Sequence, residues 1–160
     1  MIFTRKEIIK RHGVENLEGK NTSLYVPDRN YQQVSHEWCE KKWYPMLDKL
    51  KHITCPDHNL FQKFLSDRPF NKGPYFDCDN FAWLALVSAQ LAWFYTAIEG
   101  EKAQAPGVFV IGGYFNGSTH AMIRLDLLHY GIGDCEPQNL WMNFHPVIEG
   151  KKYEVCHFIC

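Results

Sequence analysis

The segment from Phe81 to Ile98 constrains the fold more than any other part of the chain. Only Ser88, Gln90 and Thr96 interrupt its run of apolar and aromatic residues. A helix that is apolar on all sides belongs in the interior of a domain. The sequence therefore predicts a central, buried helix over this segment.

The predicted start of this helix carries a cysteine. Asp77 is a suitable N-cap and Gly100 a suitable stop, so Cys78 falls in the first helical turn. There the helix dipole and the backbone N–H groups stabilise a thiolate, and the same N–H groups can stabilise an oxyanion. Cys78 is a candidate nucleophile, although a free cysteine is as often a small buried apolar residue.

Length and composition limit the classes of protein to consider. The 160 residues are 46% hydrophobic and 15% aromatic, which is typical of one globular domain. The net charge of −1 comes from 17 basic and 18 acidic residues, so nothing calls for nucleic acid or an anionic membrane as a partner. Charged residues begin at Arg5 with no apolar signal region before them, and no uninterrupted apolar run reaches 18 residues. We therefore expect a cytoplasmic protein whose six cysteines are reduced thiols.

Helices are predicted before the central helix, and strands after it. Thr4 and Glu7 form a capping box for a helix that Gly13 ends, and Ser35 opens a second helix that Pro45 ends or kinks. A third helix is expected over 57–66, and tryptophans 38, 43, 83 and 93 are expected in the core.

The second half of the chain has the signals of an antiparallel sheet. Asn116-Gly117 is a strong hairpin signal between strands over 108–115 and 120–127. Gly131, Gly133 and Asp134 are predicted to form the next turn, and further strands are expected over 138–144 and 153–159. Gly112-Gly113 marks either a bulge or an approach for a substrate backbone. Helices over about 1–100 followed by strands over about 105–160 predict one α+β domain spanning 1–160.

A cysteine nucleophile needs a base, and the base needs an orienting group. Candidates occur in the order Cys78, His120, Glu136, with the histidine beside the hairpin turn and the glutamate after the next turn. Asp126 is a weak rival because six residues along one strand separate it from His120 by about 20 Å. Asp134 stays a rival.

Three motifs resemble one protein family. They are Asp77 to Ala82, Gly117 to Ala121 and Glu136 to Gln138. They resemble the papain-like and transglutaminase-like cysteine hydrolase superfamily. Within it they are most similar to the C-terminal peptidase domain of chimeric mushroom agglutinins and to free-standing relatives in phages and bacteria.

The resemblance implies a papain-like fold in which the Cys helix packs on an antiparallel sheet. It implies a cysteine peptidase or amidase acting on a peptide or protein through a thioester. Cys78 would be the nucleophile, His120 the general base and acid, and Glu136 the orienting group. A phage origin would place the protein in the host cytoplasm.

Supporting residues are also assigned by this resemblance. Gln138 would be a second polar group at the site, and Trp141 could shield the histidine from water. Asn71 is the nearest amide that could serve as second oxyanion donor. The resemblance alone raises calcium as a cofactor, for which Asp77, Asp79, Asp126 and Asp134 are loose candidates. No calcium loop matches, so no cofactor is expected to be required.

Two other functions fit the same residues. The triad could transfer an acyl group to an amine, as in transglutaminases, or the fold could serve as a non-catalytic binding or inhibitory protein. The residues His52, Cys55, Asp57 and His58 have metal-ligand types but lack the paired spacing of a zinc site. No metal site is predicted, and the sequence does not define the substrate or the oligomeric state.

Overall fold

The fold is described from a computed structural model. It covers residues 1–17, 24–54, 78–98, 104–115, 118–136, 145–146 and 154–160. Within these residues the chain mixes helices and strands, so the α+β prediction is confirmed at this level. The third predicted helix, over 57–66, and the predicted strand over 138–144 lie outside the described residues.

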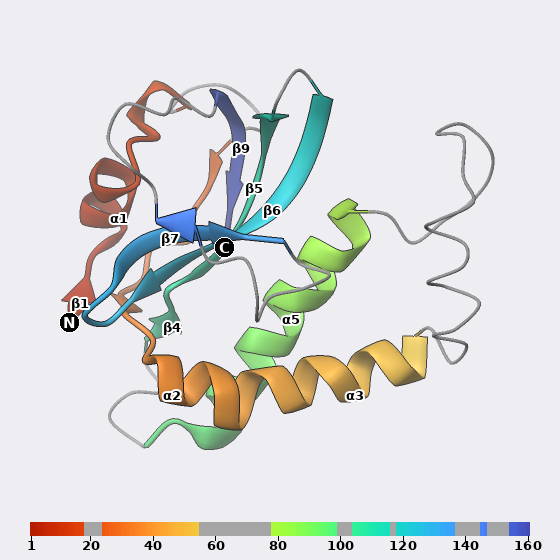
Figure 1. Ribbon diagram of the computed structural model, residues 1–160. Coiled ribbons are helices and arrows are strands. Elements are labelled where there is room, and N and C mark those ends of the chain that lie inside the picture. Colours follow the sequence, from red (N-terminus) through yellow and green to blue (C-terminus); the bar gives the residue numbers. More distant parts are fainter. Residues whose placement is uncertain (18–23, 55–77, 99–103, 116–117, 137–144, 147–153) are drawn as a thin grey trace.

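A six-stranded sheet forms the centre of the molecule (Figure 1), in the order β2-β9-β5-β6-β7-β8. All its neighbouring strands are antiparallel except β2 and β9, which run parallel. A small second sheet has the order β1-β3-β4. The strands of the large sheet are β2 (Leu24–Tyr25), β5 (Val108–Phe115), β6 (Ser118–Leu127), β7 (Gly131–Cys135), β8 (His145–Pro146) and β9 (Glu154–Ile159), and those of the small sheet are β1 (Ile2–Phe3), β3 (Tyr31–Gln32) and β4 (Ala105–Pro106).

The predicted hairpin is the longest strand pair. β5 and β6 pair from Val108 opposite Leu125 to Phe115 opposite Ser118, which confirms the predicted strand pair, although β6 begins two residues before the predicted His120. Residues 116–117 lie outside the described residues. The register of β5 against β9 shifts between Gly112 and Gly113. The bulge reading of these glycines is therefore confirmed.

The predicted turn at Gly131 and Gly133 is wrong, because both residues belong to β7. The turn lies just before them and includes His129, whose φ of 71° is unusual for a residue with a side chain. Gly131, which follows the turn, has a φ of 78°, a backbone conformation that glycine adopts readily because it has no Cβ. Asp134 is held in the strand opposite Arg124.

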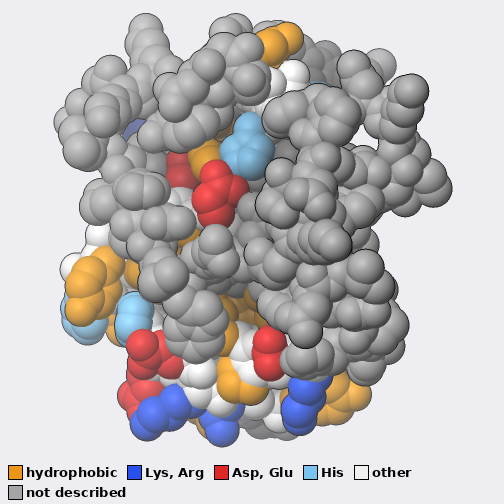
Figure 2. Space-filling view, turned by 45° about the vertical axis from the view of Figure 1, so that its right-hand side comes forward, with side chains coloured by type: hydrophobic (Ala, Val, Ile, Leu, Met, Phe, Trp, Pro, Cys, Tyr) orange, Lys and Arg blue, Asp and Glu red, His pale blue; other side chains and the backbone are white. Residues whose placement is uncertain are grey.

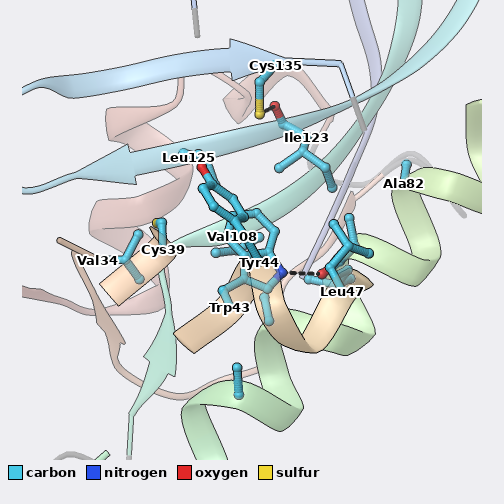
Figure 3. Close-up of a cluster of buried hydrophobic side chains, with 14 of the residues drawn as sticks. Val34, Cys39, Trp43, Tyr44, Leu47, Ala82, Val108, Ile123, Leu125 and Cys135 are labelled. Atoms are coloured by element: carbon cyan, nitrogen blue, oxygen red, sulfur yellow. Dashed lines mark hydrogen bonds between the residues drawn. The ribbon is translucent and has the colours of Figure 1, made fainter. Parts of the chain in front are cut away.

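Helices cover both faces of the large sheet. α5 (Cys78–Thr96) packs on one face, where its small residues meet the odd-numbered residues of β6 such as Ile123 and Leu125 (Figure 3). α1 (Arg5–Arg11) covers the other face through Ile8 and Ile9, which join a second core cluster. This second cluster also contains Phe109, Ile111, Met122 and Phe158. The sheet thus separates two apolar cores.

The prediction of a fully buried central helix is wrong for one face of α5. Its buried face consists largely of small residues that are at most 1% exposed, which let the helix lie close to the sheet. Its opposite face is apolar but exposed, and Trp83 lies there at 44% exposure rather than in the core. The buried small residues are Ala82, Ala85, Ala89 and Ala92, and the exposed large ones are Trp83, Val87, Leu91, Phe94 and Tyr95. In the described part of the chain, no helix is both long and apolar enough to cross a membrane.

The N-terminal helices follow their predicted caps. Thr4 caps α1 and forms the expected capping box with Glu7, and Ser35 caps α2 (His36–Trp38). Pro45 does not end the second helix, which continues through the π-helical turn η2 (Cys39–Trp43) into α3 (Tyr44–Thr54). The N–H of Tyr44 donates to the carbonyl of Cys39, five residues back. This wider turn is how the helix continues through a proline that cannot donate a hydrogen bond.

Candidate functional site

A histidine and a glutamate from neighbouring strands form the polar pair at the candidate site. The Nε2 atom of His120 lies 2.8 Å from Oε1 and 2.9 Å from Oε2 of Glu136. The side chains are 22% and 29% exposed, so the pair is partly shielded but reachable from solvent. Figure 2 shows a histidine side chain against acidic side chains on the face turned toward the viewer.

The strand register explains why these two residues meet. Ile123 pairs with Cys135 in the antiparallel β6–β7 ladder, and Glu136 directly follows β7. This places Glu136 diagonally opposite His120 on the same face of the sheet, within reach of long side chains. The buried pair of Arg124 and Asp134 occupies the next positions on this face.

The two rival carboxylates belong to other contacts. Asp126 accepts hydrogen bonds from Arg11 at 2.6 and 3.0 Å and from Gln33 at 2.8 Å. Asp134 accepts two from Arg124, at 2.7 and 2.9 Å. Both carboxylates are almost fully buried in these pairs. The carboxylate beside His120 is therefore that of Glu136.

The pair fixes the state of the imidazole ring. An ionised carboxylate only accepts hydrogen bonds, so in the neutral ring the hydrogen is on Nε2 and the lone pair is on Nδ1. A proton taken up by the ring is stabilised by the adjacent carboxylate as an ion pair. The arrangement can therefore hold an imidazole in one orientation and support its gain of a proton.

Cys78 is the first residue of α5, as its predicted place in the first turn requires. The structure describes its backbone, and its side chain lies outside the described part. The predicted supporting residues Asn71, Gln138 and Trp141 also lie outside the described residues.

The buried thiols of the described residues are poor candidates for thiolate chemistry. Burial raises the pKa of Cys39 to about 12 and that of Cys160 to about 11. Burial also raises the pKa of Cys135 far above its usual range. None of these three thiols is part of a disulfide. A buried thiol with a raised pKa stays protonated and inert at neutral pH.

The described residues do not fit a calcium or zinc site. No group of three or more His, Cys, Asp or Glu side chains among them could hold a metal ion. Asp126 and Asp134, two of the calcium candidates, have both oxygens engaged by arginines. Asp77 and the segment that contains Cys55 and His58 lie outside the described residues.

Comparison with known proteins identifies the fold. The structure is similar to a chain described as "PSL1a-E64 complex", with a TM-score of 0.63, 13% sequence identity and coverage of 100% of this chain and 50% of that one. It is equally similar to Polyporus squamosus lectin bound to the epitope Neu5Aca2-6Galb1-4GlcNAc, with a TM-score of 0.62, 14% identity and coverage of 99% of this chain and 49% of that one. The chain thus spans about half the length of these mushroom lectin chains. No protein-family model and no curated protein sequence matches it.

Two features of the molecule were not predicted from the sequence. One is a groove beside α5. The sequence holds a signal for it, because small residues recur at Ala82, Ala85 and Ala89 and large apolar residues lie between them. The other is the buried His12 at the end of α1. Its neighbours in the sequence are charged or small and give no sign of burial.

Proposed function

We propose that the protein is a cysteine-type peptidase or amidohydrolase in which Cys78, His120 and Glu136 form the catalytic triad. The observation that carries this proposal is the contact of both Glu136 carboxylate oxygens with one ring nitrogen of His120. The position of Cys78 at the start of α5 adds a nucleophile that a helix N-terminus would activate. The papain-like class proposed from the sequence motifs is part of this proposal.

The proposed reaction starts with proton transfer from the Cys78 thiol to Nδ1 of His120. The thiolate attacks the carbonyl carbon of a peptide or amide bond, and the oxyanion is stabilised by N–H groups at the start of α5. His120 then gives its proton to the leaving amine, which leaves a thioester on Cys78. Water attacks the thioester with His120 as base and releases the acid and the free thiol. Glu136 holds the ring and stabilises the imidazolium throughout.

The proposal makes a specific demand on the geometry. Ala121 and Ile123, not His120, point from β6 toward the core cluster that contains α5. The sulfur of Cys78 must therefore reach His120 around the start of β6, from the N-terminal end of α5. A thiol further along α5 could not reach His120 in this way.

The test is selective labelling of the thiol at mildly acidic pH. Iodoacetamide at pH 6 should label one cysteine of the wild type rapidly, and Cys78→Ala should lose this fast reaction together with hydrolysis of fluorescent casein. Cys156→Ala, which removes a partly exposed thiol, is the matched control and should keep both. E64 is a suitable second probe because a neighbour of the same fold was solved in complex with it.

Two other outcomes separate the alternatives. A wild type without a fast-reacting thiol at pH 6 contradicts the proposal and leaves a binding protein on this fold. Incorporation of dansylcadaverine into casein, dependent on Cys78, would instead identify an acyl transferase. We expect removal of calcium with EDTA to leave activity unchanged, because no step of the proposed reaction uses a metal ion.

A further inference from the structure

A groove of about 500 Å³ lies beside α5, between this helix and the segments that carry Arg29, Gln104 and Cys160. α5 contributes apolar side chains to it from Trp83 to Phe94. The volume is in the range of sites that bind small molecules or short peptides. None of the described lining residues belongs to the His120–Glu136 pair, so the groove is a separate feature.

The apolar wall of the groove is unusually exposed. Trp83 is 44%, Val87 49% and Phe94 64% exposed, and they lie on one side of the same helix. Large apolar side chains gathered on one exposed surface mark a binding site more often than single exposed ones do. The wall therefore fits a ligand with apolar side chains.

Two glutamines that line the groove each have one buried, unpaired side-chain atom. The Nε2 atom of Gln90 and the Oε1 atom of Gln104 are shielded from solvent and have no hydrogen-bond partner in the described part of the chain. Leaving such groups unpaired costs free energy, so each calls for an explanation. A peptide group has a C=O that can accept from Nε2 of Gln90 and an N–H that can donate to Oε1 of Gln104.

Arg29 is the charged side chain among the described residues that line the groove. Its guanidinium carbon lies 5.7 Å from the centre of the Tyr31 ring. The ion pairs between described residues do not include it. A guanidinium favours a carboxylate, which it can bind through two parallel hydrogen bonds. The charge of the groove thus favours an anionic over a cationic ligand.

We propose that this groove binds the C-terminus of a polypeptide that ends in large apolar residues. We expect the N–H of the terminal residue to donate to Oε1 of Gln104 and the preceding carbonyl to accept from Nε2 of Gln90, after these two side chains turn toward the ligand. Its carboxylate meets Arg29, and its side chain packs against Trp83 and Val87. Such capture of a C-terminus is a known mode of peptide recognition. The proposal does not depend on the chemistry of Cys78.

Three labelled peptides test the proposal by fluorescence anisotropy. The first has three glycines and three leucines with a free C-terminal carboxylate, the second is its C-terminal amide, and the third is an amide with glutamate as last residue. With the Cys78→Ala protein, which cannot cleave them, the free acid should bind at least tenfold more tightly than the other two. Arg29→Gln should remove this preference. Equal binding of the three peptides by the unsubstituted groove would overturn the proposal.

Substitutions in the groove sharpen the test. Gln90→Leu should weaken binding of the free acid about tenfold and yet raise the melting temperature, because it removes a buried unpaired donor. A purely structural role predicts a lower melting temperature. Val87→Asp should abolish binding, whereas Tyr130→Asp, at a 66% exposed residue outside the groove, should leave it unchanged.

Other occupants would overturn the proposal in recognisable ways. A dimer in sedimentation that Val87→Asp dissociates, without peptide binding, would identify a second copy as the occupant. Binding to phosphatidylcholine vesicles that Val87→Asp abolishes, without peptide binding, would identify a lipid surface. Absence of the fast-reacting thiol would leave peptide binding intact, so the two proposals can fail separately.

Discussion

The ring of His12 is buried, and neither ring nitrogen has a hydrogen-bonding partner in the described part of the chain. Its ring packs 4.7 Å from the ring of Phe109 and 5.1 Å from that of Phe158. Burial lowers its pKa to about 3, and Arg124 adds to the decrease while Asp126 opposes it. The folded protein therefore strongly disfavours protonation of this ring.

This burial predicts a pH-dependent loss of stability. Because the pKa of His12 is lowered on folding, its contribution is complete above about pH 6.5, the unfolded value, and is lost as the pH falls toward 3. The loss is about 1.4 kcal/mol per pH unit in that range. Between pH 7 and 4.5 the wild type should lose about 3 kcal/mol more than His12→Leu in urea unfolding. Equal losses in the two proteins would contradict this prediction.

The two carboxylates of Asp134 and Glu136, near β6 and β7, should differ in what they support. Asp134→Asn leaves the buried Arg124 without its charged partner and should lower the free energy of unfolding by about 3 to 5 kcal/mol. Glu136→Gln alters a partly exposed pair and should cost less than about 1 kcal/mol. Only Glu136→Gln should slow iodoacetamide labelling at pH 6 by an order of magnitude or more. A folded Asp134→Asn protein with the same loss of thiol reactivity would contradict this division.

At the scale of elements, α5 owes its position to the size of its side chains. Ala89 is 0% exposed against the sheet, whereas Leu91 is 37% exposed on the opposite side. Ala89→Leu should therefore destabilise the protein by about 1 to 3 kcal/mol through overpacking. Leu91→Ala, which removes a larger apolar group, should change stability by less than about 0.5 kcal/mol. Chemical denaturation of both variants measures the difference, and the reverse order would show that the assigned faces are wrong.

The same helix shows what the sequence could not predict. Hydropathy could not distinguish the faces of α5, because both are apolar and differ only in the size of their residues. The exact position of the turn near Gly131 could not be predicted either, because a glycine at positive φ can lie within a turn or directly after it. Continuation through Pro45 depends on a π-helical turn that no residue type marks.

Local hydrogen-bonding chemistry was predictable, and so was part of the site. The capping box of Thr4 and Glu7 and the hairpin joining β5 to β6 follow from residues close together in the chain. The pairing of His120 with Glu136 was reached from their order and the needs of thiol chemistry. The sequence could not reject Asp134, because its pairing with Arg124 depends on the β6–β7 register.

At the scale of the whole molecule, one strand pair joins the two cores. In β5, Val108 and Val110 face the α5 side, while Phe109 and Ile111 face the α1 side. Loss of packing in one core therefore destabilises a strand whose other side chains form part of the second core. We expect the described parts of the chain to unfold as one cooperative unit.

The tryptophans make this cooperativity measurable. Trp43 and Trp93 belong to the core on the α5 side, with Trp38 packed against it, whereas Ile9 belongs to the core on the α1 side. Ile9→Ala should lower stability by about 2 to 5 kcal/mol and shift the urea midpoint equally by tryptophan fluorescence and by far-ultraviolet circular dichroism. Ile2→Ala, at a 50% exposed residue of the same end of the chain, should shift neither by much. A different outcome would be an unchanged fluorescence transition and a dichroism transition that splits in two. In that case the tryptophans would keep their packing after α1 had lost its packing against the sheet. The two faces of the sheet would then be independent folding units.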